Sequence, residues 1–192
     1  YMARISSFTL SARRYDMNLK RPAGTSRGIL HQKTTYFLCL ESQSKVYWGE
    51  AGVFPNLSPE AGPDFEHKLN ELTKEANANQ HFPQASEYQH LPSLAFALEQ
   101  IEIALSYNHH AGKHRFCAYD TAFNQSKMGI PINGLIWMGD AGFMQEQIDS
   151  KLDQGFSCLK MKIGAIDWDK EIQLLKGIRS RYSAETLTLR VD

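Results

Sequence analysis

The second part of the sequence alternates between strand-like and helix-like segments, and this alternation limits the fold more than any other feature. β-Branched and apolar residues gather in three short segments, at 132–138, 157–163 and 186–191. Between them, segments 140–154 and 167–182 carry apolar residues at helical spacing. Helices joined to strands by such short turns predict a β-α-β-α-β unit with parallel strands.

Side-chain alternation divides each of the last two strands into an apolar face and a polar face. The polar faces carry Cys158, Lys160, Lys162, Thr188, Arg190 and Asp192. A parallel strand covered by helices on both faces should be almost entirely apolar. A barrel explains the pattern, because helices cover its outside while polar residues at the carboxyl ends of its strands line an active site. We therefore expect the start of a TIM-like barrel.

The first part of the chain has a different rhythm. It predicts strands at 5–12 and 34–40, a third strand ending in Tyr47–Gly52, and helices at about 63–77 and 94–106. Strands followed by helices indicate an α+β unit.

Turn and cap residues mark several boundaries. Segment 20–28 contains the Pro, Gly and Ser residues of a mobile loop. The run Ser58-Pro59-Glu60 is typical of a helix start. Gly155 should end one helix of the second part, and Asp167 should be the N-cap of the next.

Composition and charge exclude several classes of function. The formal net charge is zero, which leaves no electrostatic footprint for nucleic acid or an anionic membrane. No apolar run approaches the roughly 18 residues of a membrane span. Residues 1–4 lack a signal-peptide pattern, and the three widely spaced cysteines fit free thiols in a reducing compartment. We expect a cytoplasmic protein.

The polar residues of the two strands favour proton transfer at carbon. Two ammonium groups on one strand face disfavour each other's charge, so Lys160 or Lys162 could exchange a proton with a carbon acid. Removing a proton α to a carboxylate creates an enediolate, which needs a divalent cation or strong donors to form. Asp192 is suited to be a first oxygen ligand for Mg²⁺. One carboxylate cannot hold the ion alone.

Several short motifs occur in an order that resembles the enolase superfamily, in its muconate-lactonizing subgroup. They are Trp48-Gly49-Glu50, PSLAFALE at 92–99, PINGL at 131–135, Lys160-Met161-Lys162-Ile163-Gly164 and Arg190-Val191-Asp192. The resemblance covers the N-terminal part of such proteins. It implies an α+β capping domain at 1–125, followed at 126–192 by the first β-α-β-α-β part of a (β/α)7β barrel that stops after the third strand.

The resemblance also implies a role for each polar strand residue. Lys162 would be the acid/base, Lys160 its electrostatic partner, and Asp192 the first of three ligands for Mg²⁺, with Mn²⁺ as an alternative metal. The other ligands and a second acid/base lysine would lie beyond Asp192.

Within the superfamily, PINGLIW and Arg190 are most similar to the o-succinylbenzoate synthases. That resemblance implies a lyase that dehydrates a cyclohexadiene carboxylate in menaquinone biosynthesis. Dipeptide epimerases, N-succinylamino-acid racemases and muconate cycloisomerases share much of this half and stay open as alternatives. The expected partner is a small-molecule carboxylate, and a homo-oligomer is compatible with the sequence.

Two loops of the capping domain would close over the barrel mouth in this family, at 23–28 and 51–57. The expected substrate contacts are Thr25, Ser26, Arg27, Phe54 and Arg190.

Plainer interpretations compete with each of these. Paired lysines on a strand are usually a solvated surface, and Arg190 has an equal claim to be a barrel-interior salt-bridge partner. The three tryptophans, Trp48, Trp137 and Trp168, are expected to be packing residues. A different class of function is an inactive fragment with only structural or docking properties, because three strands cannot close a barrel that needs about eight.

Overall fold

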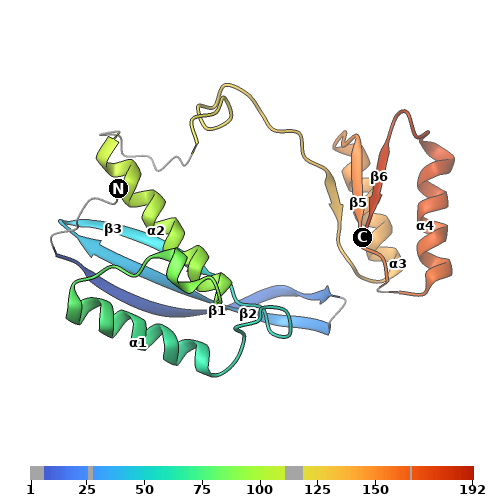
Figure 1. Cartoon of the computed structure of the whole chain (residues 1–192). Coiled ribbons are helices and arrows are strands. Elements are labelled where there is room, and N and C mark those ends of the chain that lie inside the picture. Colours follow the sequence, from blue (N-terminus) through green and yellow to red (C-terminus); the bar gives the residue numbers. More distant parts are fainter. Residues whose placement is uncertain (1–6, 26–27, 111–118, 165) are drawn as a thin grey trace. The chain divides into compact units, whose positions relative to one another are not determined.

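The computed structural model describes residues 7–25, 28–110, 119–164 and 166–192 (Figure 1). The chain divides into two compact units by its internal contacts. One unit comprises 1–18 and 32–127, and the other comprises 19–31 and 128–192.

The first sheet has the strand order β1-β2-β3. Its strands are β1 (Thr9–Thr25), β2 (Gly28–Ser42) and β3 (Lys45–Ala51). Strands β2 and β3 pair antiparallel, with Leu38 opposite Gly49. Alternation along β2 buries Leu38 and Leu40 on the face that the helices cover.

The loop expected at 20–28 is wrong for most of its length. Strand β1 continues to Thr25 and β2 begins at Gly28, so the two strands form a long hairpin (Figure 1). Pro22 lacks an amide hydrogen, but β1 is an edge strand of this sheet, where a missing donor is tolerated. Pairing with β2 therefore overrides the local Pro and Gly content.

In the described part of the first unit, two α-helices and a short 3-10 helix follow the sheet. They are α1 (Asp64–Asn79), η1 (Ala85–Tyr88) and α2 (Pro92–His110). Both expected helices are present, and α2 is longer at both ends than its predicted range. Their buried side chains join those of the sheet in one core, which includes Leu10, Leu38, Leu40, Phe65, Leu69, Leu94, Leu98 and Ile101.

The helix start expected at Ser58-Pro59-Glu60 is wrong, because the side chains of Ser58 and Glu60 accept hydrogen bonds from other segments of the backbone. The Ser58 hydroxyl oxygen accepts the Phe54 amide hydrogen at 3.0 Å and so stabilises a turn. Buried Glu60 accepts the backbone amide hydrogen of Ser93 at 2.5 Å, in the first turn of α2. Helix α1 begins instead at Asp64.

Helix α2 lies directly against β3 at Gly49. A Cβ atom at this position would lie 1.9 Å from the carbonyl oxygen of Ala97. Beside it, the Gln100 side chain donates to the Glu50 carbonyl at 3.1 Å and accepts from the Glu50 amide at 3.2 Å. Only glycine permits this separation between strand and helix.

The side-chain amides of Asn77 in α1 and of Gln80, the C-cap of α1, form hydrogen bonds with the backbone at the start of β1. Asn77 accepts from the Leu10 amide at 2.7 Å and donates to the Leu10 carbonyl at 2.8 Å. Gln80 makes the same pair of bonds with Phe8, at 3.1 and 3.2 Å. The backbone groups of both residues are thereby satisfied by a helix rather than by a strand.

The second unit contains the β-α-β-α-β arrangement predicted from the sequence. Its elements are β4 (Gly134–Ile136), α3 (Ala141–Asp153), β5 (Cys158–Met161), α4 (Trp168–Arg181) and β6 (Thr188–Val191). The sheet order is β4-β5-β6, and both strand pairs are parallel. The predicted fold class, an α+β capping domain followed by the start of a TIM-like barrel, is confirmed.

The boundaries of α3 and α4 follow their capping residues. The Asp140 side chain accepts from the Phe143 amide at 2.9 Å, and Asp167 accepts from the Asp169 amide at 3.1 Å. Gly155, with φ of +80°, follows α3 and stops it.

Two tryptophans do not pack as expected. Trp48 is 48% exposed and Trp168 is 58% exposed. The parity of β3 places Trp48 on the face away from the core, where it meets the Phe37 ring edge-on and the Arg13 guanidinium lies 5.8 Å from its centroid.

Among the described residues, no helix is long and apolar enough to cross a membrane.

Candidate active site

One face of the parallel sheet is buried under α3 and α4, and the other face carries mostly polar residues. On the buried face, Leu159 and Met161 of β5 are 1% and 2% exposed. They share a core with Ile136, Met144, Ile148, Leu174, Ile178 and Leu187. The alternation read from the sequence therefore matches the structure: apolar residues of β5 pack beneath the helices.

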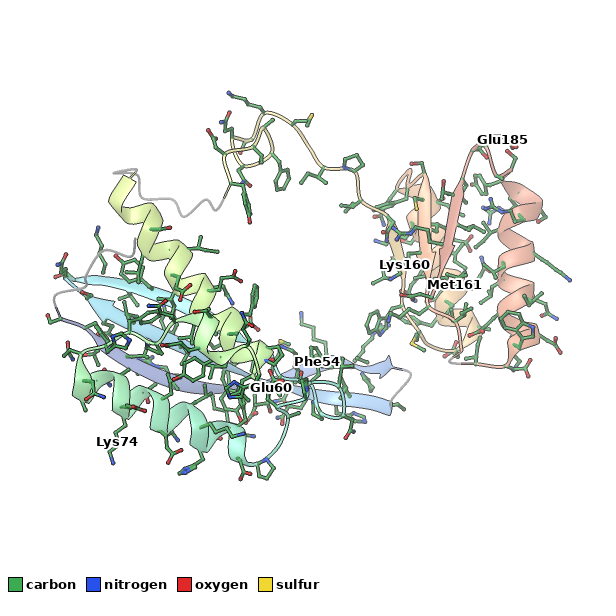
Figure 2. The ribbon with its side chains drawn as sticks, viewed as in Figure 1. Phe54, Glu60, Lys74, Lys160, Met161 and Glu185 are labelled. Atoms are coloured by element: carbon green, nitrogen blue, oxygen red, sulfur yellow. The ribbon has the colours of Figure 1, made fainter. Side chains whose placement is uncertain are left out.

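The opposite face brings together residues from all three strands. Leu135, Lys160 and Arg190 are neighbours in register across β4, β5 and β6. Lys160 is half-buried, and Figure 2 labels it beside Met161, its neighbour on the buried face. Lys162 follows two residues later, just after the end of β5, and is also half-buried.

Backbone hydrogen bonds extend the pairing of β5 and β6 beyond their ends. The Asp192 amide donates to the Met161 carbonyl at 3.3 Å, and the Ile163 amide donates to the Asp192 carbonyl at 2.8 Å. Asp192 is consequently held level with the segment that carries Lys162.

The carboxylate of Asp192 lies among three positive charges. Its Oδ2 atom is 2.7 Å from the Nζ atom of Lys160. The hydrogen bond from Lys160 lowers the pKa of Asp192 below its usual value; partial desolvation opposes this, while the charges of Lys160, Lys162 and Arg190 act in the same direction as the hydrogen bond. Asp192 is thus kept ionised, the form that a cation ligand requires.

A single carboxylate at this end of the sheet fits the chemistry of a Mg²⁺ ligand but does not complete a site. Mg²⁺ prefers about six oxygen ligands. Within the described parts of the chain, no group of three or more His, Cys, Asp and Glu side chains could hold a metal ion. The described residues therefore supply Asp192 as a candidate first ligand and no complete set around it.

The turn after Lys162 is fixed by a residue that the sequence interpretation missed. The Gly164 amide donates to Oε1 of Glu171 at 2.8 Å, and Glu171 is fully buried in the first turn of α4. Two signals in the sequence could have found it: an acidic residue in the first turn of a helix, which Asp169 shares, and helical spacing to the apolar residues Leu174 and Ile178, which Asp169 does not share.

In the first unit, a charged cluster adjoins the segment 51–57. The Lys33 ammonium lies 3.6 Å from Oε1 of Glu50 and 5.1 Å from the centroid of the Phe54 ring. The Thr35 hydroxyl donates to the same Glu50 oxygen at 2.9 Å. Phe54, which Figure 2 labels, therefore lies beside a cation.

The other expected contacts of the capping loops are not placed. Ser26 and Arg27 lie outside the described residues, as does the side chain of Thr25. The structure brings Lys160, Arg190 and Asp192 together with Lys162 in the second unit, while the roles of all these residues stay predictions.

Comparisons with known proteins agree with the fold, although no family model matches the chain. It is 40% identical to the o-succinylbenzoate synthase of Desulfotalea psychrophila over 219 aligned residues, covering 98% of this chain and 58% of that protein. The crystal structure of MenC from Desulfotalea psychrophila superposes with a TM-score of 0.70 and 31% identity, covering 97% of this chain and 57% of that one.

A more distant structure has the same fold. The dipeptide epimerase of Cytophaga hutchinsonii, complexed with Mg and the dipeptide D-Ala-L-Val, has a TM-score of 0.62 at 18% identity. The match covers 97% of this chain and 51% of that one. The chain thus spans a little over half the length of the relatives that it matches.

Proposed function

We propose, because this chain belongs to the enolase superfamily, that its protein is a Mg²⁺-dependent lyase that abstracts a proton α to a carboxylate. The observation that carries the proposal is the meeting of Lys160, Lys162 and Asp192 at one edge of the parallel sheet. The proposed substrate is the cyclohexadiene carboxylate of o-succinylbenzoate synthases, in support of which stands the relative with 40% identity.

Each residue has one proposed part in the dehydration. Lys162 takes the proton from the α carbon, which leaves an enediolate, and then delivers a proton to the departing hydroxyl so that water leaves. Lys160 is its electrostatic partner and orients Asp192 through their ion pair. Arg190 faces the substrate from the neighbouring strand, level with Lys160.

Asp192 is the proposed first ligand of Mg²⁺. When bound, the ion would neutralise the negative charge that develops on the substrate carboxylate. The chain's own contribution is to keep this ligand ionised and held in place, which its lowered pKa and its two backbone hydrogen bonds support.

The substrate is proposed to meet capping residues as well. Thr25, Ser26 and Arg27 would contact its anionic groups, and Phe54 would form an apolar wall. We further propose that the protein acts in the cytoplasm and that its partner is a small carboxylate. A homo-oligomer is compatible with this function.

The test of the base is a lysine substitution with a matched control. Lys162→Ala, in the enzyme at its natural length, should lower kcat for dehydration by a factor of about 10³ or more while leaving the circular dichroism spectrum unchanged. Lys176→Ala removes an exposed lysine of α4 and should leave kcat unchanged. Wild-type turnover by Lys162→Ala would refute the assignment of the base.

A second candidate function is dipeptide epimerisation, which the likeness to a dipeptide epimerase favours. Both reactions begin with the same proton abstraction, so the products decide. Incubation of L-Ala-L-Glu in D₂O would give α-deuteration by an epimerase. Deuterium exchange without dehydration of the cyclohexadiene carboxylate would sink the synthase proposal and leave the superfamily intact. The remaining alternatives, N-succinylamino-acid racemase and muconate cycloisomerase, are tested with their own substrates.

A structural or docking role for a chain of this length is the alternative from another class. We propose that a polypeptide of only these residues is inactive, because three strands leave a barrel open. The intact mass and the Mg²⁺-dependent turnover of the purified protein separate the two. Turnover by a species of 21.8 kDa would contradict this proposal.

A further inference from the structure

We propose that Glu171 is a positioning residue, which holds the turn after Lys162 and thereby fixes where the lysine side chain begins. The inference rests on the proposed function of Lys162. It goes beyond that function, because Glu171 lies on α4 rather than on a strand of the candidate site.

The contact itself is direct and internal. Oε1 of Glu171 accepts the Gly164 amide hydrogen at 2.8 Å, and the side chain has no solvent exposure. Gly164 has φ of +92°, a left-handed conformation that residues with a side chain rarely adopt. The chain therefore bends two residues after Lys162, and a buried carboxylate accepts the amide hydrogen at this bend.

A second hydrogen bond fixes the residue in between. The Ile163 amide donates to the Asp192 carbonyl at 2.8 Å. The two amides that follow Lys162 along the chain thus have separate acceptors, one on the neighbouring strand and one on the helix behind the sheet. Removing the Glu171 acceptor would take this partner from the Gly164 amide and leave the strand-side bond of Ile163 in place.

The surroundings of Glu171 indicate that packing alone does not explain a carboxylate here. Its neighbours on the inner face of α4, Leu174 and Ile178, are buried apolar residues of the core. An apolar side chain would continue that stripe, and burying a carboxyl group is costly unless it is hydrogen-bonded. The first turn of α4 offsets part of this cost, because a helix N-terminus favours negative charge.

The test uses three substitutions at one position. Glu171→Gln keeps an acceptor at the same reach, Glu171→Met fills the volume without one, and Glu171→Asp shortens the side chain by one methylene. Lys170→Ala is the control, since it alters an exposed residue of the same turn.

We expect Glu171→Met to lower kcat by about 10- to 100-fold with KM within about threefold of wild type, because a misplacement of 1 Å can cost about 100-fold in rate. Amide exchange at Gly164 should become faster in the same variant. Glu171→Gln should keep both kcat and the exchange rate near wild type, because its amide oxygen can still accept the Gly164 hydrogen bond. If Glu171 only filled space, Met and Gln would give similar values.

Equal kcat in wild type, Glu171→Met and Glu171→Asp would overturn the inference. If Glu171→Met fails to fold, Glu171→Gln and Glu171→Asp decide. A kcat that Glu171→Gln retains and Glu171→Asp loses supports the positioning role, and equal kcat values in these two variants refute it. Failure of the proposed function would be visible separately, as wild-type protein that neither dehydrates the proposed substrate nor exchanges its α proton.

Discussion

Replacing Gly49 by alanine tests the close approach of strand β3 to helix α2. The added Cβ would lie 1.9 Å from the Ala97 carbonyl oxygen, and such contacts are essentially never shorter than 3.0 Å. Strand β3 and helix α2 must therefore separate by about 1 Å, which overpacks the interface. The same shift strains both hydrogen bonds between Gln100 and Glu50.

We expect Gly49→Ala to lower the free energy of unfolding by about 3 kcal/mol, the upper end for overpacking, since a backbone atom cannot rotate away as a side chain can. With a urea dependence of about 2 kcal/mol per M, the midpoint should fall by roughly 1.5 M. Circular dichroism during urea titration measures it, and hydrogen exchange of the buried α2 amides reports the same loss locally.

Gly62→Ala is the matched control, because a Cβ there meets nothing within 4 Å. Its unfolding free energy should stay within about 0.5 kcal/mol of wild type. A Gly49→Ala protein as stable as this control would refute the reasoning, since it would mean that helix and strand are not in contact through this glycine.

Two further predictions concern the second unit. Lys160→Met should raise the pKa of Asp192 toward its usual value, measured by the pH dependence of its carboxyl ¹³C shift. Because the pKa of Asp192 is lowered in the folded state, the stability that this carboxylate contributes is present above its unfolded-state pKa and is lost as the pH falls through its folded-state pKa. A titration midpoint of Asp192 that Lys160→Met leaves unchanged would contradict the ion pair. Asp167→Ala should cost about 1 kcal/mol in urea unfolding by removing the α4 N-cap, whereas Asp167→Asn should not.

The architecture was predictable where local chemistry and tertiary structure agree. Asp167 caps α4 as its side chain dictates, and the parity of β5 follows from one alternation of Leu, Lys and Met. Prediction failed where a side chain serves a distant partner. Glu60 bonds to Ser93, 33 residues away, so a local helix-start signal had another use. Likewise, Pro22 is compatible with β1 only because that strand lies at an edge.

The candidate site was predictable to a similar degree. Strand parity put Lys160 and Arg190 on one face, and the register confirms that they are neighbours. Glu171 was missed although its spacing to Leu174 and Ile178 places it on the apolar stripe of α4, because a carboxylate is rarely buried and its partner, the Gly164 amide, lies outside the helix. The roles of Lys162 and Asp192 stay predictions until they are tested by substitution.

The hydrogen bonds between the side-chain amides of Asn77 and Gln80 and the backbone at the start of β1 have a consequence for self-association. An uncovered edge strand offers its N–H and C=O groups to any passing chain and so invites intermolecular strand addition. Here the backbone N–H and C=O groups of Phe8 and Leu10 are already hydrogen-bonded to two side-chain amides, which block strand addition at that end of the edge. Because these side chains come about 70 positions later in the sequence, the edge of a nascent chain stays unprotected until α1 has been synthesised and has packed against the sheet.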